Sequence, residues 1–68
     1  MKLSARNVLK GRVVKVVRGQ TTAHVKIDVG GSVITASITV DALDEMALRE
    51  GDAAYAVIKA SSVIVAKD

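Results

Sequence analysis

Two segments of the chain alternate between inward apolar and outward, mostly polar side chains, which is the period of two typical of half-buried strands. The first covers residues 22–29 and the second covers residues 32–40. Gly30 and Gly31 separate them, and a Gly-Gly pair is a strong signal for a hairpin turn. We therefore expect two neighbouring antiparallel strands. Their predicted inward side chains are Ala23, Val25, Ile27 and Val29 on the first and Ile34, Ala36, Ile38 and Val40 on the second.

Three other segments have the β-branched or continuously apolar composition of strands. Residues 9–18 are rich in valine and end at Gly19, which marks a turn. Residues 53–60 form another apolar run, and residues 63–66 form a short final one. Together with the alternating pair, the sequence predicts five short strands.

Residues 41–50 follow a different spacing, because apolar side chains recur three and four positions after Leu43, as on one face of a helix. Asp41 is the expected N-cap and Gly51 the expected stop. Five strands with one short helix before the fourth strand predict an all-β fold. The expected architecture is a small five-stranded OB-like barrel that is closed or nearly closed. We expect residues 1–68 to form a single domain.

The composition of the chain also favours self-association. Half of the 68 residues are apolar, and there is no cysteine to form disulfides or a thiolate metal site. A single core in so short a chain is marginal. Association with further copies of the chain is an ordinary way to cover the excess apolar surface.

Charge and motif content narrow the class of protein. No segment is apolar for long enough to span a bilayer, and the N-terminus lacks the apolar region of a secretory signal, so we expect a cytoplasmic protein. The net charge of +3 suits an anionic ligand and nucleic acid alike. The single histidine, His24, and the scattered carboxylates form no nucleophile and base set, which predicts no enzyme and no metal site. We expect His24 on a solvent face, with a second anion site as the less favoured alternative.

Four motifs along the chain carry a resemblance to a known family. They are SARN at 4–7 with LKG at 9–11, ITASIT at 34–39, LREG at 48–51 and AVIKAS at 56–61. Their succession resembles the molbindin (Mop) family, a molybdate- and tungstate-binding OB-like domain of the TOBE type, over essentially the whole chain. The same unit recurs in molybdate transporter ATPases and in molybdate-responsive regulators. The pairing of SARN with VIKAS is the most specific part.

The resemblance implies a hexamer, built as a trimer of dimers, with oxyanion sites between subunits and no cofactor beyond the ligand, molybdate or tungstate. It also implies a role in intracellular molybdenum storage or homeostasis. Carried over by motif, the implied oxyanion-binding residues are Ser4, Ala5, Arg6, Thr39, Lys59, Ala60 and Ser61. The chain departs from the family at Ala42, where many relatives have a serine, so one hydroxyl donor is missing.

These residue types suit a tetrahedral dianion, which offers only hydrogen-bond acceptors. The serines and the threonine supply hydroxyl donors, Lys59 and Arg6 supply charge, and the small alanines let an anion approach backbone N–H groups. Each residue also has an ordinary structural interpretation. Lys59 would be an edge-strand lysine, Arg6 a solvated terminal charge and the hydroxyl residues turns or caps.

Two other functions remain open at this point. A nucleic-acid-binding barrel of the OB or cold-shock type is favoured by a basic run on the first strand, formed by Lys10, Arg12, Lys15 and Arg18, and by a pI near 9.6. Such barrels stack bases on exposed aromatic side chains, and this chain has one Tyr, no Phe and no Trp, which makes nucleic acid the weaker hypothesis. The third possibility is an oligomerisation module without a ligand.

Overall fold

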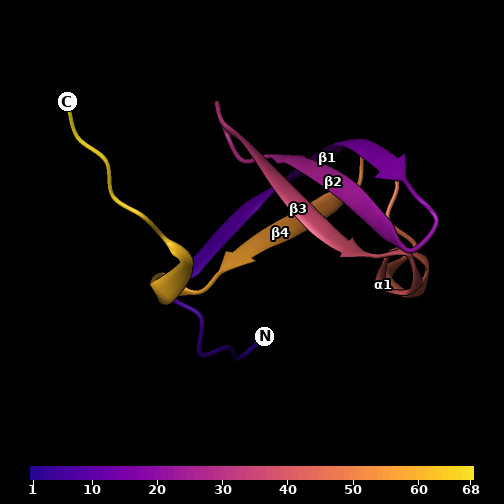
Figure 1. The fold of residues 1–68 in the computed structure, drawn as a ribbon, viewed down its shortest axis with the longest axis horizontal. Helices are drawn as coiled ribbons and strands as arrows, with labels where there is room; N and C mark the ends of the chain where they lie inside the picture. The colour runs from indigo at the N-terminus through magenta and orange to yellow at the C-terminus, as the bar shows by residue number, and fades with distance from the viewer.

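The computed structural model describes residues 1–68 and consists of one antiparallel sheet with a short helix at one end (Figure 1). The strand order in the sheet is β3-β2-β1-β4. In chain order the elements are β1 (Asn7–Arg18), β2 (Thr22–Asp28), β3 (Val33–Thr39), α1 (Val40–Met46), β4 (Ala53–Ile58) and the 3-10 turn η1 (Ala60–Ser62).

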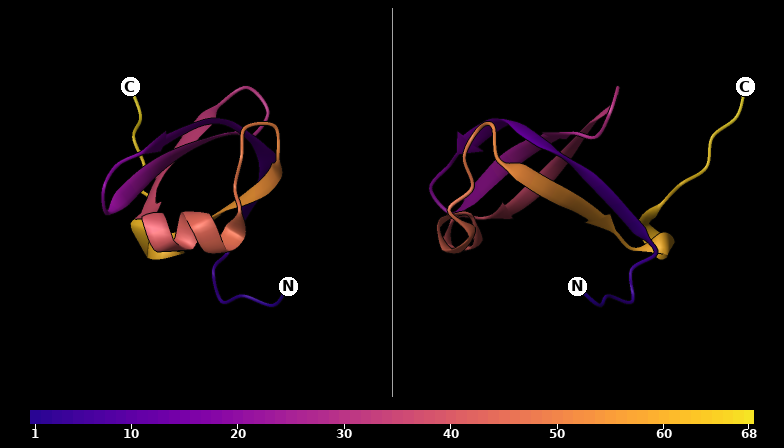
Figure 2. Two further views of the ribbon diagram at one scale, coloured as in Figure 1. Left: turned by 90° about the vertical axis from the view of Figure 1, so that its right-hand side faces the viewer. Right: turned by 180° about the vertical axis from the view of Figure 1, so that it is seen from behind.

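The long strand β1 has a different partner along each half. Up to Arg12 it pairs with β4, and from Arg12 onward it pairs with β2. Gly11 lies at this changeover, where a Cβ atom would clash with the backbone of Asp28, so only glycine allows the close approach. A register shift between Val13 and Lys15 bends the strand further. The sheet consequently curls into an open half-barrel, with α1 across one end (Figure 2).

The predicted alternation of β2 and β3 is confirmed. The inward side chains of β2 are buried, and those of β3 are half-buried. Only six of the 68 side chains are buried in the chain, namely Val13, Ala23, Val25, Ile27, Leu43 and Ala56. This core is small for so apolar a sequence, and many large apolar side chains therefore remain on the surface.

The helix is shorter than the predicted 41–50, and its N-cap is Thr39 rather than Asp41. The hydroxyl oxygen of Thr39 accepts a hydrogen bond from the backbone N–H of Ala42 at 3.0 Å, which satisfies one free donor of the first turn. Asp41 instead lies within the first turn. The left-handed backbone of Ala47 (φ 49°) ends the helix early. This helix is much shorter and less apolar than a membrane-crossing helix, and the chain contains no other that could cross.

The prediction of a fifth strand over residues 63–66 is wrong for the single chain, and β4 ends at Ile58 instead of residue 60. The turn η1 directs the chain away from the sheet, so the tail has no neighbouring strand to pair with its backbone groups (Figure 1). Ile64 is 92% exposed and Val65 is 89% exposed. The sheet keeps two unpaired edges, β3 and β4, and the barrel is open rather than closed.

Candidate oxyanion site

The residues predicted to bind an oxyanion lie at two opposite ends of β1. Residues 4–6 precede β1 and residues 59–61 follow β4, and these two segments meet because Asn7 pairs with Ile58. Thr39 ends β3 near the far end of β1 (Figure 1). We call the first group the basic cluster, which consists of Ser4, Ala5, Arg6, Lys59, Ala60 and Ser61. We call Thr39 with the first turn of α1 the helix corner.

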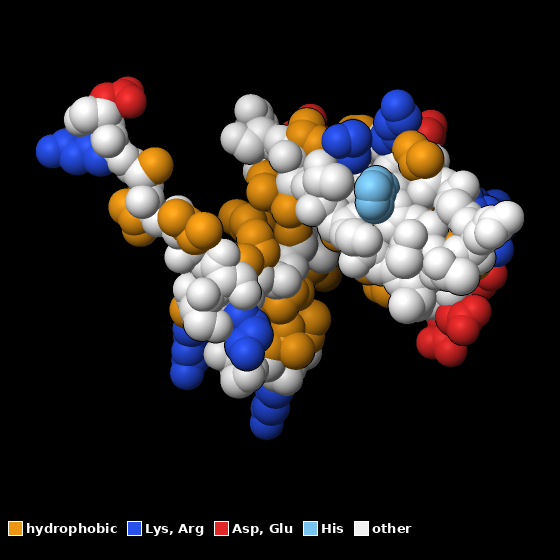
Figure 3. All heavy atoms as spheres, viewed as in Figure 1, with side chains coloured by type: hydrophobic (Ala, Val, Ile, Leu, Met, Phe, Trp, Pro, Cys, Tyr) orange, Lys and Arg blue, Asp and Glu red, His pale blue; other side chains and the backbone are white.

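The basic cluster combines unpaired donors with positive charge. The side-chain amide of Asn7 donates to the carbonyl oxygen of Ile58 at 3.2 Å and ties its two segments together. Within η1 the first hydrogen bonds come from Ser62 and Val63, so the N–H groups of residues 60–61 find no partner in the turn. Residues 1–11 and 53–62 contain no carboxylate. Lys and Arg side chains project from this end of the molecule (Figure 3).

The helix corner offers one hydroxyl donor in a fixed position. Because the oxygen of Thr39 accepts from Ala42, its own hydrogen is free to donate outward, and the side chain is exposed. The N–H of Val40 donates to the carbonyl oxygen of Thr21 at 3.0 Å, which anchors the start of α1 to the β1–β2 turn. The side chain of Ala42 adds no hydrogen-bond donor to the helix corner, as the sequence indicated.

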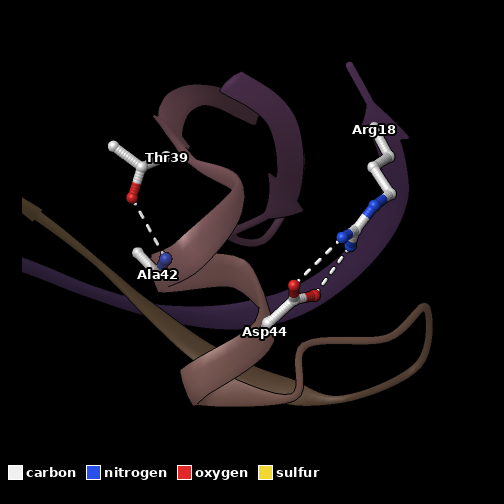
Figure 4. A network of polar contacts seen from close by, with 4 residues as sticks. All are labelled: Arg18, Thr39, Ala42 and Asp44. Carbon is white, nitrogen blue, oxygen red and sulfur yellow. Dashed lines mark hydrogen bonds and ion pairs between the residues drawn. The ribbon is translucent and has the colours of Figure 1, made fainter. Parts of the chain in front are cut away.

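An ion pair that the sequence analysis missed holds α1 against the end of β1. The two terminal guanidinium nitrogens of Arg18 donate to the carboxylate of Asp44, at 2.7 and 3.0 Å (Figure 4). These hydrogen bonds and the guanidinium charge lower the pKa of Asp44 from its ordinary value. The same contact raises the pKa of Arg18. The partners are 26 residues apart, so no local pattern could have indicated the pair.

His24 lies exposed on the outer face of β2, as expected, with Val17 and Ser37 as its cross-strand neighbours. A shallow hollow of about 150 Å³ lies beside it and is lined by Val17, Arg18, Gly19, Thr22 and His24. No group of three or more His, Asp or Glu side chains is placed to hold a metal ion.

The inner face of the half-barrel carries an apolar groove rather than an anion site. Its volume is about 560 Å³, and eleven of its twelve lining residues are hydrophobic. It is lined by β2, β3 and β4 together with Met1, the end of α1 and the loop before β4, and it includes the half-exposed Tyr55. An oxyanion would lose its hydration there without gaining hydrogen bonds.

The chain matches the TOBE domain family over residues 3–65. It is 48% identical over 66 residues to a probable molybdenum-pterin-binding protein of Haemophilus influenzae, and the match covers 96% of each chain. The structure of a molybdate-binding protein from Sporomusa ovata superposes with a TM-score of 0.94 at 36% identity, over 98% of this chain and all of that one. The cytoplasmic molybdate-binding protein ModG, solved with molybdate bound, gives a TM-score of 0.89 at 43% identity, with 94% of this chain covering 46% of that one.

These likenesses extend over the curled sheet, the short helix and both ends of the chain, so the mostly-β architecture is that of an OB-like molbindin fold. The chain belongs to the molbindin (Mop) family of TOBE domains.

Proposed function

We propose that this protein binds molybdate or tungstate at sites formed between the subunits of a homo-oligomer, a hexamer built as a trimer of dimers. The oxyanion positions implied by the family lie at the two opposite ends of β1, and this separation supports sites between subunits. The relatives that bind molybdate or molybdenum-pterin are the support for the ligand. The expected ligand residues are those of the basic cluster together with Thr39.

The distance between the two groups supports donors from more than one chain. The twelve residues of β1 have a length of roughly 35 Å along the chain, so even in a bent strand the two ends lie much farther apart than the about 3 Å of a hydrogen bond to an oxyanion. Thr39 and Lys59 of one chain therefore do not contact the same anion. A second chain, placed with its helix corner against the basic cluster of the first, brings both sets of donors to one ligand.

The charges at the two ends favour this head-to-tail contact. The basic cluster contains Arg6 and Lys59 and no carboxylate, whereas α1 carries Asp41 in its first turn and no basic side chain. In Figure 3 blue Lys and Arg side chains project from the lower left, and red acidic side chains gather at the lower right, where further blue side chains lie nearby. Complementary charge of this kind steers association and fixes the orientation of the partners.

The apolar surface of the half-barrel also supports assembly. The groove between β3 and β4 is open, while the tail displays Ile64 and Val65 to solvent. An apolar tail without a partner and a sheet with two free edges are complementary between copies of the chain. Covering both surfaces in an oligomer would remove the excess apolar area that the small core leaves exposed.

The role that fits these features is binding rather than catalysis. Four or five charge-assisted hydrogen bonds suffice for micromolar affinity or better after association costs of at least about 4 kcal/mol. A small oligomer with such sites would act in the cytoplasm as a store or buffer of the oxyanion, and its relative ModG is described as cytoplasmic.

Calorimetric titration of the oligomer with molybdate and tungstate tests this proposal, with sulfate and phosphate as controls. We expect saturable binding of the first two anions and little heat from the others. Equal binding of all four would indicate a general anion surface, and no binding of any would support an oligomerisation module without a ligand.

A further inference from the structure

The ion pair between Arg18 and Asp44 is the only one in the chain, and it joins α1 to the end of β1. Both side chains are about half exposed, so the pair is expected to contribute little to the free energy of unfolding. Its geometry is nevertheless specific, because two parallel N–H···O bonds fix the guanidinium plane against the carboxylate. A contact of this kind orients an element more than it stabilises the fold.

Besides this ion pair, helix α1 is held by the packing of Val40 and Leu43 on the core and by backbone hydrogen bonds at its two ends. It contains seven residues, less than two full turns, and Leu43 is its one buried side chain. Its start is held by the hydrogen bond from Val40 to Thr21, and its end depends on the left-handed Ala47. Without the Arg18–Asp44 contact, the helix could rotate or fray from its C-terminal end.

The Thr39 hydroxyl depends on the orientation of this same helix. Its oxygen accepts from Ala42 in the first turn, so a rotation of the helix changes the direction in which the hydroxyl donates. Five residues correspond to about 140° around a helix, which places Asp44 away from Thr39. Figure 4 shows the ion pair on the other side of α1 from the Thr39 side chain. The pair is therefore positioned to act through the helix rather than on an anion at Thr39.

We propose that Arg18 and Asp44 are positioning residues for the oxyanion site, because their two-point contact fixes the helix that directs the Thr39 hydroxyl. This inference rests on the proposed function. It has an unusual consequence for an anion site: a carboxylate near the site strengthens anion binding. A purely electrostatic view gives the opposite sign, since removal of Asp44 takes away a negative charge and frees the cation of Arg18.

The two views predict opposite changes in molybdate affinity when Asp44 is replaced. The test therefore compares molybdate titrations of the parent oligomer with those of Asp44→Asn, Arg18→Lys and the matched control Glu45→Gln. Glu45 is the adjacent helix carboxylate and has no ion-pair partner. We expect Asp44→Asn to weaken binding about 2- to 5-fold through lost preorganisation, and Glu45→Gln to leave it unchanged or tighter. Arg18→Lys keeps the charge and loses the two-point contact, so we expect it to weaken binding as well.

Several outcomes would overturn the inference. If the Asp44→Asn variant binds molybdate as tightly as the Glu45→Gln variant, or more tightly than the parent, then only the charge of these residues affects binding. A lower melting temperature of the ligand-free variants with unchanged affinity would show a merely structural role. If Asp44→Asn does not assemble, Arg18→Lys decides: reduced affinity supports the inference, and parental affinity overturns it. A parent that does not bind molybdate contradicts the proposed function itself, and the inference falls with it.

Discussion

Lys59 is the only charged side chain between Ala53 and Ala66, and it follows the last residue of β4 directly. Its backbone is extended, and η1 begins with the next residue. The lysine therefore stands beside the N–H groups of residues 60–61, which have no partner within the turn. A compact ammonium next to free N–H donors is well suited to a dianion, because it supplies charge without the planar demands of a guanidinium.

We expect Lys59→Met to weaken molybdate binding about 30- to 1000-fold, which is the effect of losing one desolvated charged hydrogen bond. Methionine keeps much of the stem volume, so fold and assembly should persist. Ligand binding raises the melting temperature of the parent, and this rise should nearly vanish in the variant. Lys10→Met, on the neighbouring strand β1, is the matched control and should retain the full rise. Equal stabilisation of the parent and Lys59→Met by molybdate would identify Lys59 as an ordinary edge-strand lysine.

Among the elements, α1 shows how local signals compete. Both Thr39 and Asp41 are good N-cap residues, and the alternation of β3, which continues to residue 40, favours Asp41. The structure uses Thr39, whose extended backbone still belongs to the strand. Helix ends are commonly marked by glycine, so the left-handed conformation of Ala47 was not predictable from residue type.

We expect Ala47→Gly to raise the free energy of unfolding by about 0.5–1 kcal/mol. Glycine removes the Cβ strain of the left-handed conformation, and the greater freedom of the unfolded chain offsets part of this gain. The melting temperature without ligand should rise by about 2–8 °C. Ala42→Gly, the same change inside α1, should instead lower it, because glycine at a helical position is destabilising. A loss of stability in Ala47→Gly would show that the strain at Ala47 is compensated elsewhere.

The sequence predicted those parts of the fold that depend on the local period of apolar and polar side chains. Alternation identified β2 and β3 with their inward faces, and the change of period placed the helix between β3 and β4. The fifth strand could not be judged in this way, because a strand is defined by a partner, and residues 63–66 have none in one chain. The division of the candidate site between the two ends of β1 also required the register of Asn7 with Ile58. The Arg18–Asp44 pair depended on tertiary placement alone.

In the molecule as a whole, most of the apolar side chains lie outside the buried core. Six buried side chains form the core, while a groove of about 560 Å³ and an apolar tail remain open to solvent. The tail leaves the sheet instead of folding back over it (Figure 1). Surface of this kind favours association of identical chains over a stable monomer.

The tail provides a direct test of assembly, because Ile64 is 92% exposed in the single chain. In a monomer, Ile64→Asp would be an ordinary surface change with an effect within about 0.5 kcal/mol. In the proposed oligomer, the carboxylate would be buried against an apolar groove without a partner, which is strongly unfavourable. We therefore expect Ile64→Asp to dissociate the oligomer and to abolish molybdate binding, since the sites need two chains. Sedimentation equilibrium should give six times the chain mass of 7.1 kDa for the parent and a much smaller mass for the variant. Lys67→Asp places the same carboxylate three residues farther along and should leave assembly intact. An Ile64→Asp protein that remains hexameric would place the tail outside the interface, and a monomeric parent at micromolar concentration would contradict the intersubunit sites altogether.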